Sequence, residues 1–282
     1  RREVVAIGMF DGVHLGHQKV LAMAADFALR NKAKSVAITF DSIPKKHSLS
    51  CQTLSTLDEK IQLIKATGIE KVKVLSFKKI KNLSAEKFFN CYLKDYVGIV
   101  VGHDFRFGRN KNGNVATIKK FCKNVVVVKP VKHSTKIISS TQIKKKLLAG
   151  KIEDVSKLLG RNYTFCGVVV SGCGLGRKLG FPTANLKVSK KKILPEGVFT
   201  SNVKVGDRKH HSVTYIGRRP TFGILPVTIE VYIVNFSGQL HGKKLQVNIL
   251  SKIRNGKKFQ SAEKLVKQIK NDVKIAGEKG KK

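Results

Sequence analysis

The hydrophobic pattern of the chain changes near residue 150, and this change constrains the fold more than any other feature. In the first half, segments of helical spacing alternate with short apolar runs at residues 4–7, 36–40, 72–75, 99–101 and 125–128. Strands that alternate with helices form βαβ units. We therefore expect residues 1–150 to form an α/β domain with a parallel, Rossmann-like sheet.

In the second half, strand-sized runs follow one another at short intervals with turn residues between them. They lie at residues 167–171, 198–205, 212–216, 228–234 and 245–250. Closely spaced strands of this kind are typical of an antiparallel barrel or sandwich. A final helix is indicated by Leu265, Ile269 and Val273, which recur at intervals of four. We expect residues 151–282 to form this second, mainly β domain.

Composition excludes several classes of protein. The 282 residues are 41% hydrophobic and 26% charged, as in ordinary globular chains. No run approaches the roughly 18 apolar residues of a membrane span, and no signal peptide pattern opens the chain, so we expect no membrane partner. The five cysteines include no CxxC pair. Reduced thiols are therefore expected, which favours a cytoplasmic location.

The charge is strongly positive but evenly spread. The chain has 56 Lys and Arg against 18 Asp and Glu, a formal net charge of +38. Such a balance is compatible with nucleic acid as a partner, but a binding footprint should be clustered. Residues 1–141 hold 26 of the basic side chains and residues 142–282 hold 30. We expect no nucleic-acid partner, and no pattern indicates an oligomeric state.

The strongest functional signal is the run GMFDGVHLGH at residues 8–17, which follows the first strand and opens the first helix. The N–H groups and positive dipole end of a helix start attract phosphate, and glycine permits close approach. His14 and His17, three residues apart, can donate hydrogen bonds to a phosphoryl group that gains charge in a transition state. They are the candidate catalytic residues of the first half.

Four further segments carry candidate chemistry. Residues 139–144 (SSTQIK) can cap a helix or bind phosphate, and residues 101–108 (VGHDFRFG) set aromatic side chains beside charges. Residues 172–185 (GCGLGRKLGFPTAN) form a glycine-rich loop without a Walker ending. Residues 227–234 alternate between an apolar face and a polar face, and Glu230 lies in mid-strand on the polar face, where a carboxylate can be a catalytic base or half of a structural ion pair.

These motifs resemble those of one family. Residues 8–17 are similar to the phosphate-binding signature of nucleotidylyltransferases. Together with the other segments and residues 217–222, they resemble the bifunctional riboflavin kinase/FMN adenylyltransferases, the prokaryotic FAD synthetases. The resemblance implies a C-terminal riboflavin-kinase barrel and a parallel-sheet adenylyltransferase domain. It implies ATP or phosphate binding by Gly8, Phe10, Asp11, Gly12, Gly16, Ser139, Ser140, Thr141, Lys144, Gly172, Gly174 and Gly180.

The same resemblance implies the substrates and remaining roles. Riboflavin would be phosphorylated by ATP to FMN, and FMN adenylylated by a second ATP to FAD with release of pyrophosphate. Glu230 would be the kinase base. The flavin would contact Asp104, Phe105, Arg106 and Phe107, and Mg²⁺ would be held by Thr183 and Asn185.

The chain departs from the family pattern at two places in its first half. Lys144 stands where the family usually has Arg, and residues 41–44 lack a usual Pro-His pair. An alternative is therefore that only one activity is retained, riboflavin kinase rather than adenylyltransferase.

Overall fold

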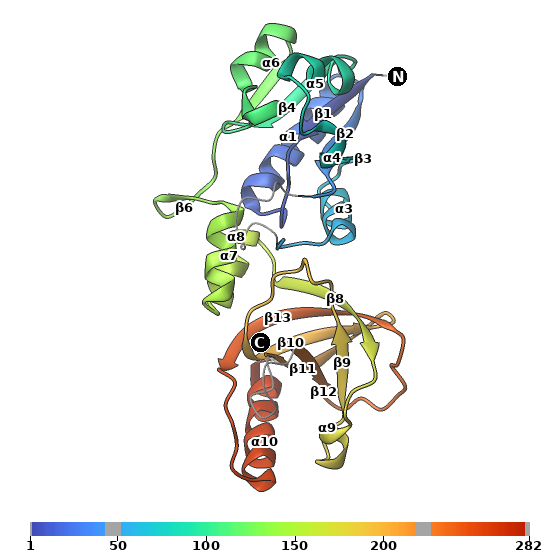
Figure 1. Ribbon diagram of the computed structural model, residues 1–282, viewed down its shortest axis with the longest axis vertical. Coiled ribbons are helices and arrows are strands. Elements are labelled where there is room, and N and C mark those ends of the chain that lie inside the picture. The colour runs from blue at the N-terminus through green and yellow to red at the C-terminus, as the bar shows by residue number, and fades with distance from the viewer. Residues whose placement is uncertain (1, 43–51, 218–226, 280–282) are drawn as a thin grey trace. The chain divides into compact units, whose positions relative to one another are not determined.

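The computed structural model describes residues 2–42, 52–217 and 227–279. By packing, the chain divides into two compact units, Arg1–Ser140 and Thr141–Lys282. Each unit has its own sheet and its own helices (Figure 1).

The first unit is built on a parallel five-stranded sheet. Its strands are β1 (Glu3–Ile7), β2 (Lys34–Phe40), β3 (Lys71–Leu75), β4 (Gly98–Gly102) and β5 (Val125–Val128). Their order in the sheet is β3-β2-β1-β4-β5, so β1 is the central strand. After β1, the chain adds β2 and β3 on one side of β1 and then crosses to add β4 and β5 on the other side. The expected parallel sheet is confirmed.

Helices cover both faces of this sheet. Its helical segments are α1 (Leu15–Arg30), α3 (Leu57–Lys65), α4 (Phe77–Ile80), α5 (Ala85–Tyr92), the 3₁₀ turn η1 (Arg109–Lys111) and α6 (Val115–Phe121). Val4 and Ala6 of β1 pack with Leu21 of α1 in one core cluster. Val5 and Ile7 pack in a second cluster with side chains of α5 and α6. A strand buried on both faces must be apolar throughout, which explains the uninterrupted run at residues 4–7.

A hairpin and two short helices follow β5 along the chain. A two-stranded hairpin pairs β6 (Lys132–His133) with β7 (Lys136–Ile137). Helix α7 (Ser140–Leu148) begins directly at the boundary between the two units, and α8 (Ile152–Leu159) follows it.

The second unit is a closed antiparallel barrel. Its strands are β8 (Tyr163–Val170), β9 (Thr183–Lys187), β10 (Gly197–Val205), β11 (Arg208–Gly217), β12 (Thr228–Ile233) and β13 (Lys244–Arg254). Around the barrel they run β10-β11-β12-β9-β8-β13. A short helix α9 (Leu175–Lys178) lies between β8 and β9. The expected antiparallel architecture is confirmed, and closure makes it a barrel rather than a sandwich.

The C-terminal helix α10 (Ala262–Lys279) packs on the barrel wall formed by β10 and β11. Ala276 and Val273 contact Val198 and Val213 there. Arg254, at the end of β13, donates through Nε and Nη2 to the carboxylate of Asp272 at 2.7–3.1 Å. Asp272 is 2% exposed, so this ion pair is a buried link between the helix and the barrel.

Candidate functional sites

The loop after β1 lies where the topology of the sheet favours a ligand site. In open α/β sheets, ligands bind outside the carboxyl ends of the strands, at the point where the strand order reverses. Here that point is between β1 and β4. Residues 8–14 follow β1 and residues 103–107 follow β4. The fold therefore places the two motifs at the same edge of the sheet.

His14 and His17 form a stacked pair at the start of α1. Their ring centroids are 3.6 Å apart with an interplanar angle of 22°. His14 is the N-cap, and its Nδ1 accepts a hydrogen bond from the backbone N–H of His17 at 3.4 Å. A neutral imidazole that accepts at Nδ1 carries its proton on Nε2. Nε2–H of His14 is then its hydrogen-bond donor for a ligand.

His17 is held in its neutral form. Burial lowers its pKa well below the ordinary 6.5, and the neighbouring His14 and the cation of Lys60 lower the pKa further. The ring of Phe10 packs edge-on against the His17 ring, with ring centroids 5.4 Å apart. Within the described part of the chain, the buried Nδ1 of His17 has no hydrogen-bond partner. A buried polar atom of this kind is expected where a ligand completes the site.

Residues 8–14, between β1 and α1, form the histidine loop, and its backbone is strained. Phe10 and Val13 have φ values of +50° and +40°, which non-glycine residues rarely adopt. Gly12 has φ +79°, and a Cβ there would lie 2.8 Å from a methyl carbon of Leu54. Such conformations persist only where surrounding contacts hold them, and they cluster at functional sites.

Asp11 and Phe10 hold the loop. Oδ1 of Asp11 accepts from the backbone N–H groups of Leu54 and Ser55, at 2.8 and 3.4 Å. Phe10 is 2% exposed and packs in the core. Both were expected to bind ATP or phosphate. In the structure the Asp11 side chain is hydrogen-bonded within the first unit and the Phe10 side chain is buried in its core.

Lys60 is a site residue that the sequence did not reveal. It lies on α3 and is 7% exposed, and its Nζ donates to the carbonyl oxygens of Met9 and Phe40 at 3.2 and 2.7 Å. Burial lowers its pKa to about 8, against the opposing effect of Asp11 and Asp41. The signal available was its position four residues before the buried Ile64, on the apolar face of the helix.

Ser140 of the SSTQIK segment is hydrogen-bonded to the loop that carries the histidines. Ser140 Oγ donates to the backbone oxygen of Asp11 at 2.9 Å, which joins residues 129 positions apart. Ser139 is half-buried beside it. Thr141 is exposed and Lys144 is buried, and both belong to the second compact unit.

The motif after β4 divides into exposed and buried side chains. Asp104 and Arg106 are exposed, with 84% of the Asp104 side chain accessible. Phe105 is half-buried and stacks on Phe107 with ring centroids 5.6 Å apart. Phe107 lies in the core, against Phe88. Of the four residues expected to bind the flavin, Asp104, Phe105 and Arg106 are accessible, and Phe107 supports Phe105 from behind.

In the barrel, strand register brings the expected kinase residues together. Glu230 of β12 is paired with Asn185 of β9, and Tyr232 with Thr183. Because residues two apart share a face, Thr183, Asn185 and Glu230 lie on the same side of the two strands. Thr183 Oγ1 donates to Glu230 Oε2 at 3.5 Å. The inward-facing neighbours Ile229, Val231 and Ile233 are buried, which explains the alternation.

A pocket of about 640 Å³ adjoins this face. Its lining includes Gly172, Gly174, Thr183 and Asn185, together with residues 236–241. From β12 it includes Val231 and Ile233 but not Glu230, so the pocket and the expected base share only the Thr183 and Asn185 positions. A Cβ on Gly172 would collide with the side-chain amide of Asn185, so glycine permits the loop to approach the strand. Gly180, with φ +83°, ends the turn after α9. Of the 217–222 motif, residues 218–222 lie outside the described residues.

The donors at this face suit Mg²⁺. Thr183, Asn185 and Glu230 present hydroxyl, amide and carboxylate oxygens, and Mg²⁺ prefers a few protein oxygens completed by water and nucleotide phosphates. Across residues 2–42, 52–217 and 227–279, no group of three or more His, Cys, Asp or Glu side chains could hold a metal. An all-protein cage is therefore not what these residues form, and a site shared with ATP fits them.

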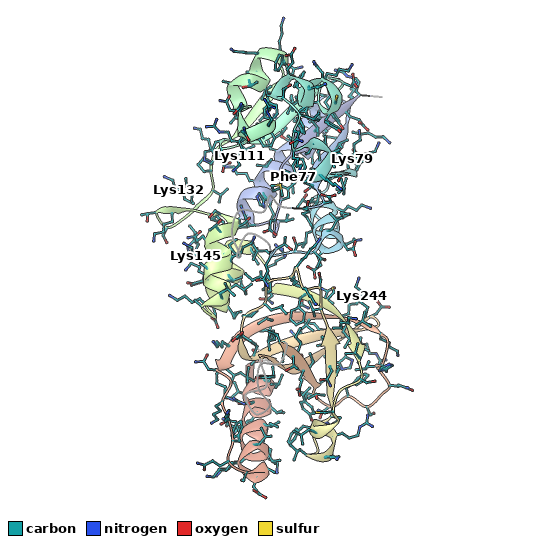
Figure 2. The ribbon with its side chains drawn as sticks, in the orientation of Figure 1. Phe77, Lys79, Lys111, Lys132, Lys145 and Lys244 are labelled. Carbon is teal, nitrogen blue, oxygen red and sulfur yellow. The ribbon has the colours of Figure 1, made fainter. Side chains whose placement is uncertain are left out.

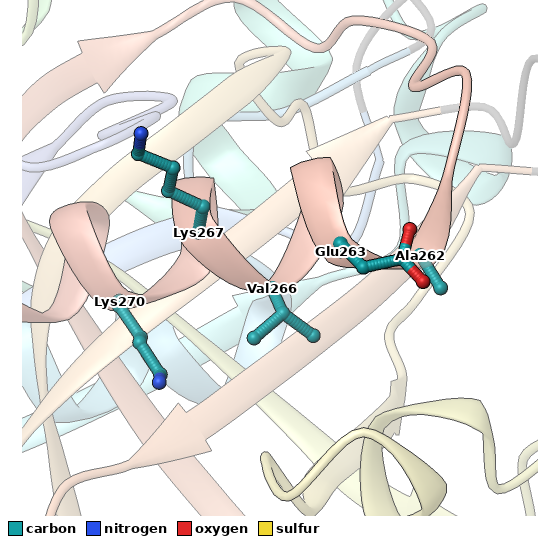
Figure 3. Close-up of a pocket in the computed structure, with 5 residues that line it drawn as sticks. All are labelled: Ala262, Glu263, Val266, Lys267 and Lys270. Atoms are coloured by element: carbon teal, nitrogen blue, oxygen red, sulfur yellow. The ribbon is translucent and has the colours of Figure 1, made fainter.

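A second hollow, of about 420 Å³, lies along α10 (Figure 3). It is lined by Ala262, Glu263, Val266, Lys267 and Lys270 of that one helix. It contains none of the candidate site residues.

Taken together, the fold and sites are those of an enzyme that handles nucleotides in two separate units, one with a histidine loop on a parallel sheet and one with a carboxylate on a barrel. The FAD synthetase family matches residues 1–142, and the riboflavin kinase family matches residues 159–279. The chain belongs to the bifunctional riboflavin kinase/FMN adenylyltransferase family.

The relatives match over nearly the whole chain. A bifunctional riboflavin kinase/FMN adenylyltransferase from Buchnera aphidicola subsp. Schizaphis graminum is 36% identical over 96% of this chain and 92% of its own length. One from Listeria monocytogenes is 30% identical over 96% and 90%. A crystal structure titled as a macrolide-efflux protein from Streptococcus pneumoniae is 31% identical, with a TM-score of 0.89 over 98% of this chain and 93% of that one.

Among the helices that the structure describes, none has the length and apolar character needed to cross a membrane. Within the described residues, Cys91 and Cys122 are free thiols.

Proposed function

We propose that this chain makes FAD from riboflavin in two steps, with a separate set of residues for each. Residues 151–282 phosphorylate riboflavin to FMN, and residues 1–150 adenylylate FMN to FAD. Both family matches support two activities, so the single-activity alternative is not favoured. A nucleic-acid-binding function would account for none of the motifs.

In the kinase step, the terminal hydroxyl oxygen of the ribityl chain attacks the γ-phosphorus of ATP. The bond from that phosphorus to the β-phosphate oxygen breaks, and ADP leaves. Glu230 accepts the hydroxyl proton. Thr183 and Asn185 would hold Mg²⁺, which would neutralise charge on the ATP phosphates. The observation that carries this assignment is the shared face of Thr183, Asn185 and Glu230.

In the adenylyl step, a phosphate oxygen of FMN attacks the α-phosphorus of ATP. The bond to the bridging oxygen of the β-phosphate breaks, and pyrophosphate leaves. His14 and His17 donate hydrogen bonds to the α-phosphate as charge builds on it. The backbone and glycines of residues 8–16 hold phosphates. The family resemblance adds the hydroxyls of Ser139, Ser140 and Thr141 and the cation of Lys144 to this role. Asp104, Phe105 and Arg106 contact the flavin. The stacked histidine pair carries this assignment.

The experiment supplies the two substrates separately. The protein is incubated with ATP and Mg²⁺ and either riboflavin or FMN, and products are resolved by chromatography. Riboflavin should give FMN and then FAD, and FMN should give FAD. If riboflavin gives only FMN and added FMN is not converted, the adenylyl assignment is wrong. We also place the reaction in the cytoplasm, since five cysteines without a CxxC pair suit a reducing compartment.

A further inference from the structure

Lys60 occupies an unusual position for a lysine. Its ammonium is inside the first unit and bridges two backbone carbonyls from different segments. Met9 belongs to the loop after β1, and Phe40 is the last residue of β2. Placing a cation inside a protein costs free energy unless polar groups compensate it, and an apolar side chain could fill the same space. The position therefore points to a role for the ammonium itself.

One of these carbonyls belongs to the strained loop. Met9 directly precedes Phe10, whose φ is +50°. Its carbonyl accepts from Lys60 and also from Thr39 Oγ1, at 3.1 Å. The bridge thus fixes the point at which the chain leaves the sheet and enters the histidine loop.

The helix that carries Lys60 is itself fixed to this loop. Thr56 and Glu59 form a capping box at the start of α3. Immediately before it, Ser55 Oγ accepts from the N–H of Gly12 at 3.1 Å, and Asp11 accepts from Leu54 and Ser55. The position of the ammonium relative to the loop is therefore determined by several independent contacts.

The charge of Lys60 also reaches the catalytic pair. The charged groups that act on it are Asp11 from the histidine loop and Asp41 after β2, which partly offset the cost of burial. The cation of Lys60 also lowers the pKa of His17 on α1, in addition to the larger effects of burial and of His14.

We propose that Lys60 is a positioning residue for adenylyl transfer: its ammonium ties the histidine loop to the end of β2 and adds positive charge to the surroundings of His17. This role rests on the proposed function of the site. The contact holds Met9, and so the strained turn that leads to His14, in one place. Burial and the neighbouring His14 lower the pKa of His17, and the charge of Lys60 lowers it further, so that His17 meets phosphate as a neutral ring.

Three variants separate these contributions. Lys60→Gln keeps an amide donor but loses the charge, and Lys60→Met loses both. Lys65→Met removes a charge from the exposed last turn of the same helix and is the matched control. Each is assayed for FMN adenylylation and for riboflavin phosphorylation, and the ring signals of His17 are titrated by NMR without substrates.

We expect Lys60→Met to lower kcat/KM for FMN adenylylation by about 10- to 100-fold, because misplaced catalytic groups cost this much. Lys60→Gln, which keeps a hydrogen-bond donor, should lower kcat/KM for FMN adenylylation by a smaller factor than Lys60→Met. Riboflavin phosphorylation, which belongs to the second unit, should be unchanged in both, and the NMR spectra should show that the first unit stays folded. The titration midpoint of His17 should rise in both variants and not in Lys65→Met.

The role is overturned if adenylylation by Lys60→Met equals that of Lys65→Met. It is also overturned if activity falls but the titration of His17 does not move, since ordinary packing would explain that result. If Lys60→Met loses both activities through unfolding, Lys60→Gln decides. A wild-type protein that converts no FMN would refute the proposed function instead, and the His17 titration would then decide the role of Lys60 alone.

Discussion

Asp11 holds the histidine loop through backbone contacts. Its Oδ1 accepts from two backbone N–H groups that precede α3, and its own carbonyl accepts from Ser140. A carboxylate aimed at phosphate would repel it, whereas one bound to backbone N–H groups stabilises the turn that presents His14. The residue is therefore best tested through stability and activity together.

We expect Asp11→Ala to destabilise the first unit by about 1–3 kcal/mol, because two buried N–H groups lose their acceptor. Asp11→Asn keeps an acceptor oxygen and should lose less. Asp26→Ala removes only an exposed ion pair with Arg30 on α1, worth about 0.5 kcal/mol or less, and is the control. Amide hydrogen exchange of β1 measures the effect. Equal protection in Asp11→Ala and Asp26→Ala would show that the contact contributes nothing.

At the residue scale, the sequence predicted the positions that depend on local geometry. His14 and His17 were recognisable because a helix start after a strand is a local feature. Lys60 was not, since a lysine is expected in solvent and only tertiary packing of α3 buries it. The core positions of Phe10 and Phe107 likewise depend on side chains that are distant in sequence.

At the scale of elements, β9 is the one barrel strand that hydrophobic patterning did not predict. Its residues Thr183–Lys187 include a single buried apolar side chain, Leu186. The polar positions of this strand are the ones that form the kinase face, so function removed the alternation by which strands are recognised. The other strands kept inward-facing apolar residues and were predicted within a few positions.

The link between α10 and the barrel gives a prediction for an element. Asp272→Ala leaves Arg254, whose side chain is only 20% exposed, without its carboxylate partner. Breaking a buried pair in this way typically costs about 3 kcal/mol or more. Urea unfolding should show that loss for the second unit. Asp207→Ala, which breaks the exposed pair with Lys204, should change stability by about 0.5 kcal/mol or less. A similar small effect for both would mean that α10 is held by its apolar contacts alone.

At the scale of the whole molecule, the charge of +38 is a property of the surface more than of the sites. Lysine side chains project from both units, among them Lys79, Lys111, Lys132, Lys145 and Lys244 (Figure 2). The even distribution expected from the sequence argues against a nucleic-acid footprint. A positive surface can still raise the encounter rate with anionic substrates.

This steering predicts a difference between the two flavins. FMN carries a phosphate and riboflavin is uncharged, so added salt should lower kcat/KM for FMN more than kcat/KM for riboflavin, with ATP saturating in both assays. Steady-state kinetics at a series of salt concentrations measure the two slopes. Equal slopes would mean that the surface charge does not guide FMN to its site.

The central claim is that two independent sites share one chain, and crossed substitutions test it most directly. Glu230→Gln and His17→Ala are each assayed for riboflavin phosphorylation and for conversion of supplied FMN. Glu230→Gln should reduce FMN formation by about 100-fold or more, as loss of a general base does, and leave FAD formation from FMN intact. His17→Ala should do the reverse. Loss of the same step in both variants would contradict the assignment of the two reactions to the two units.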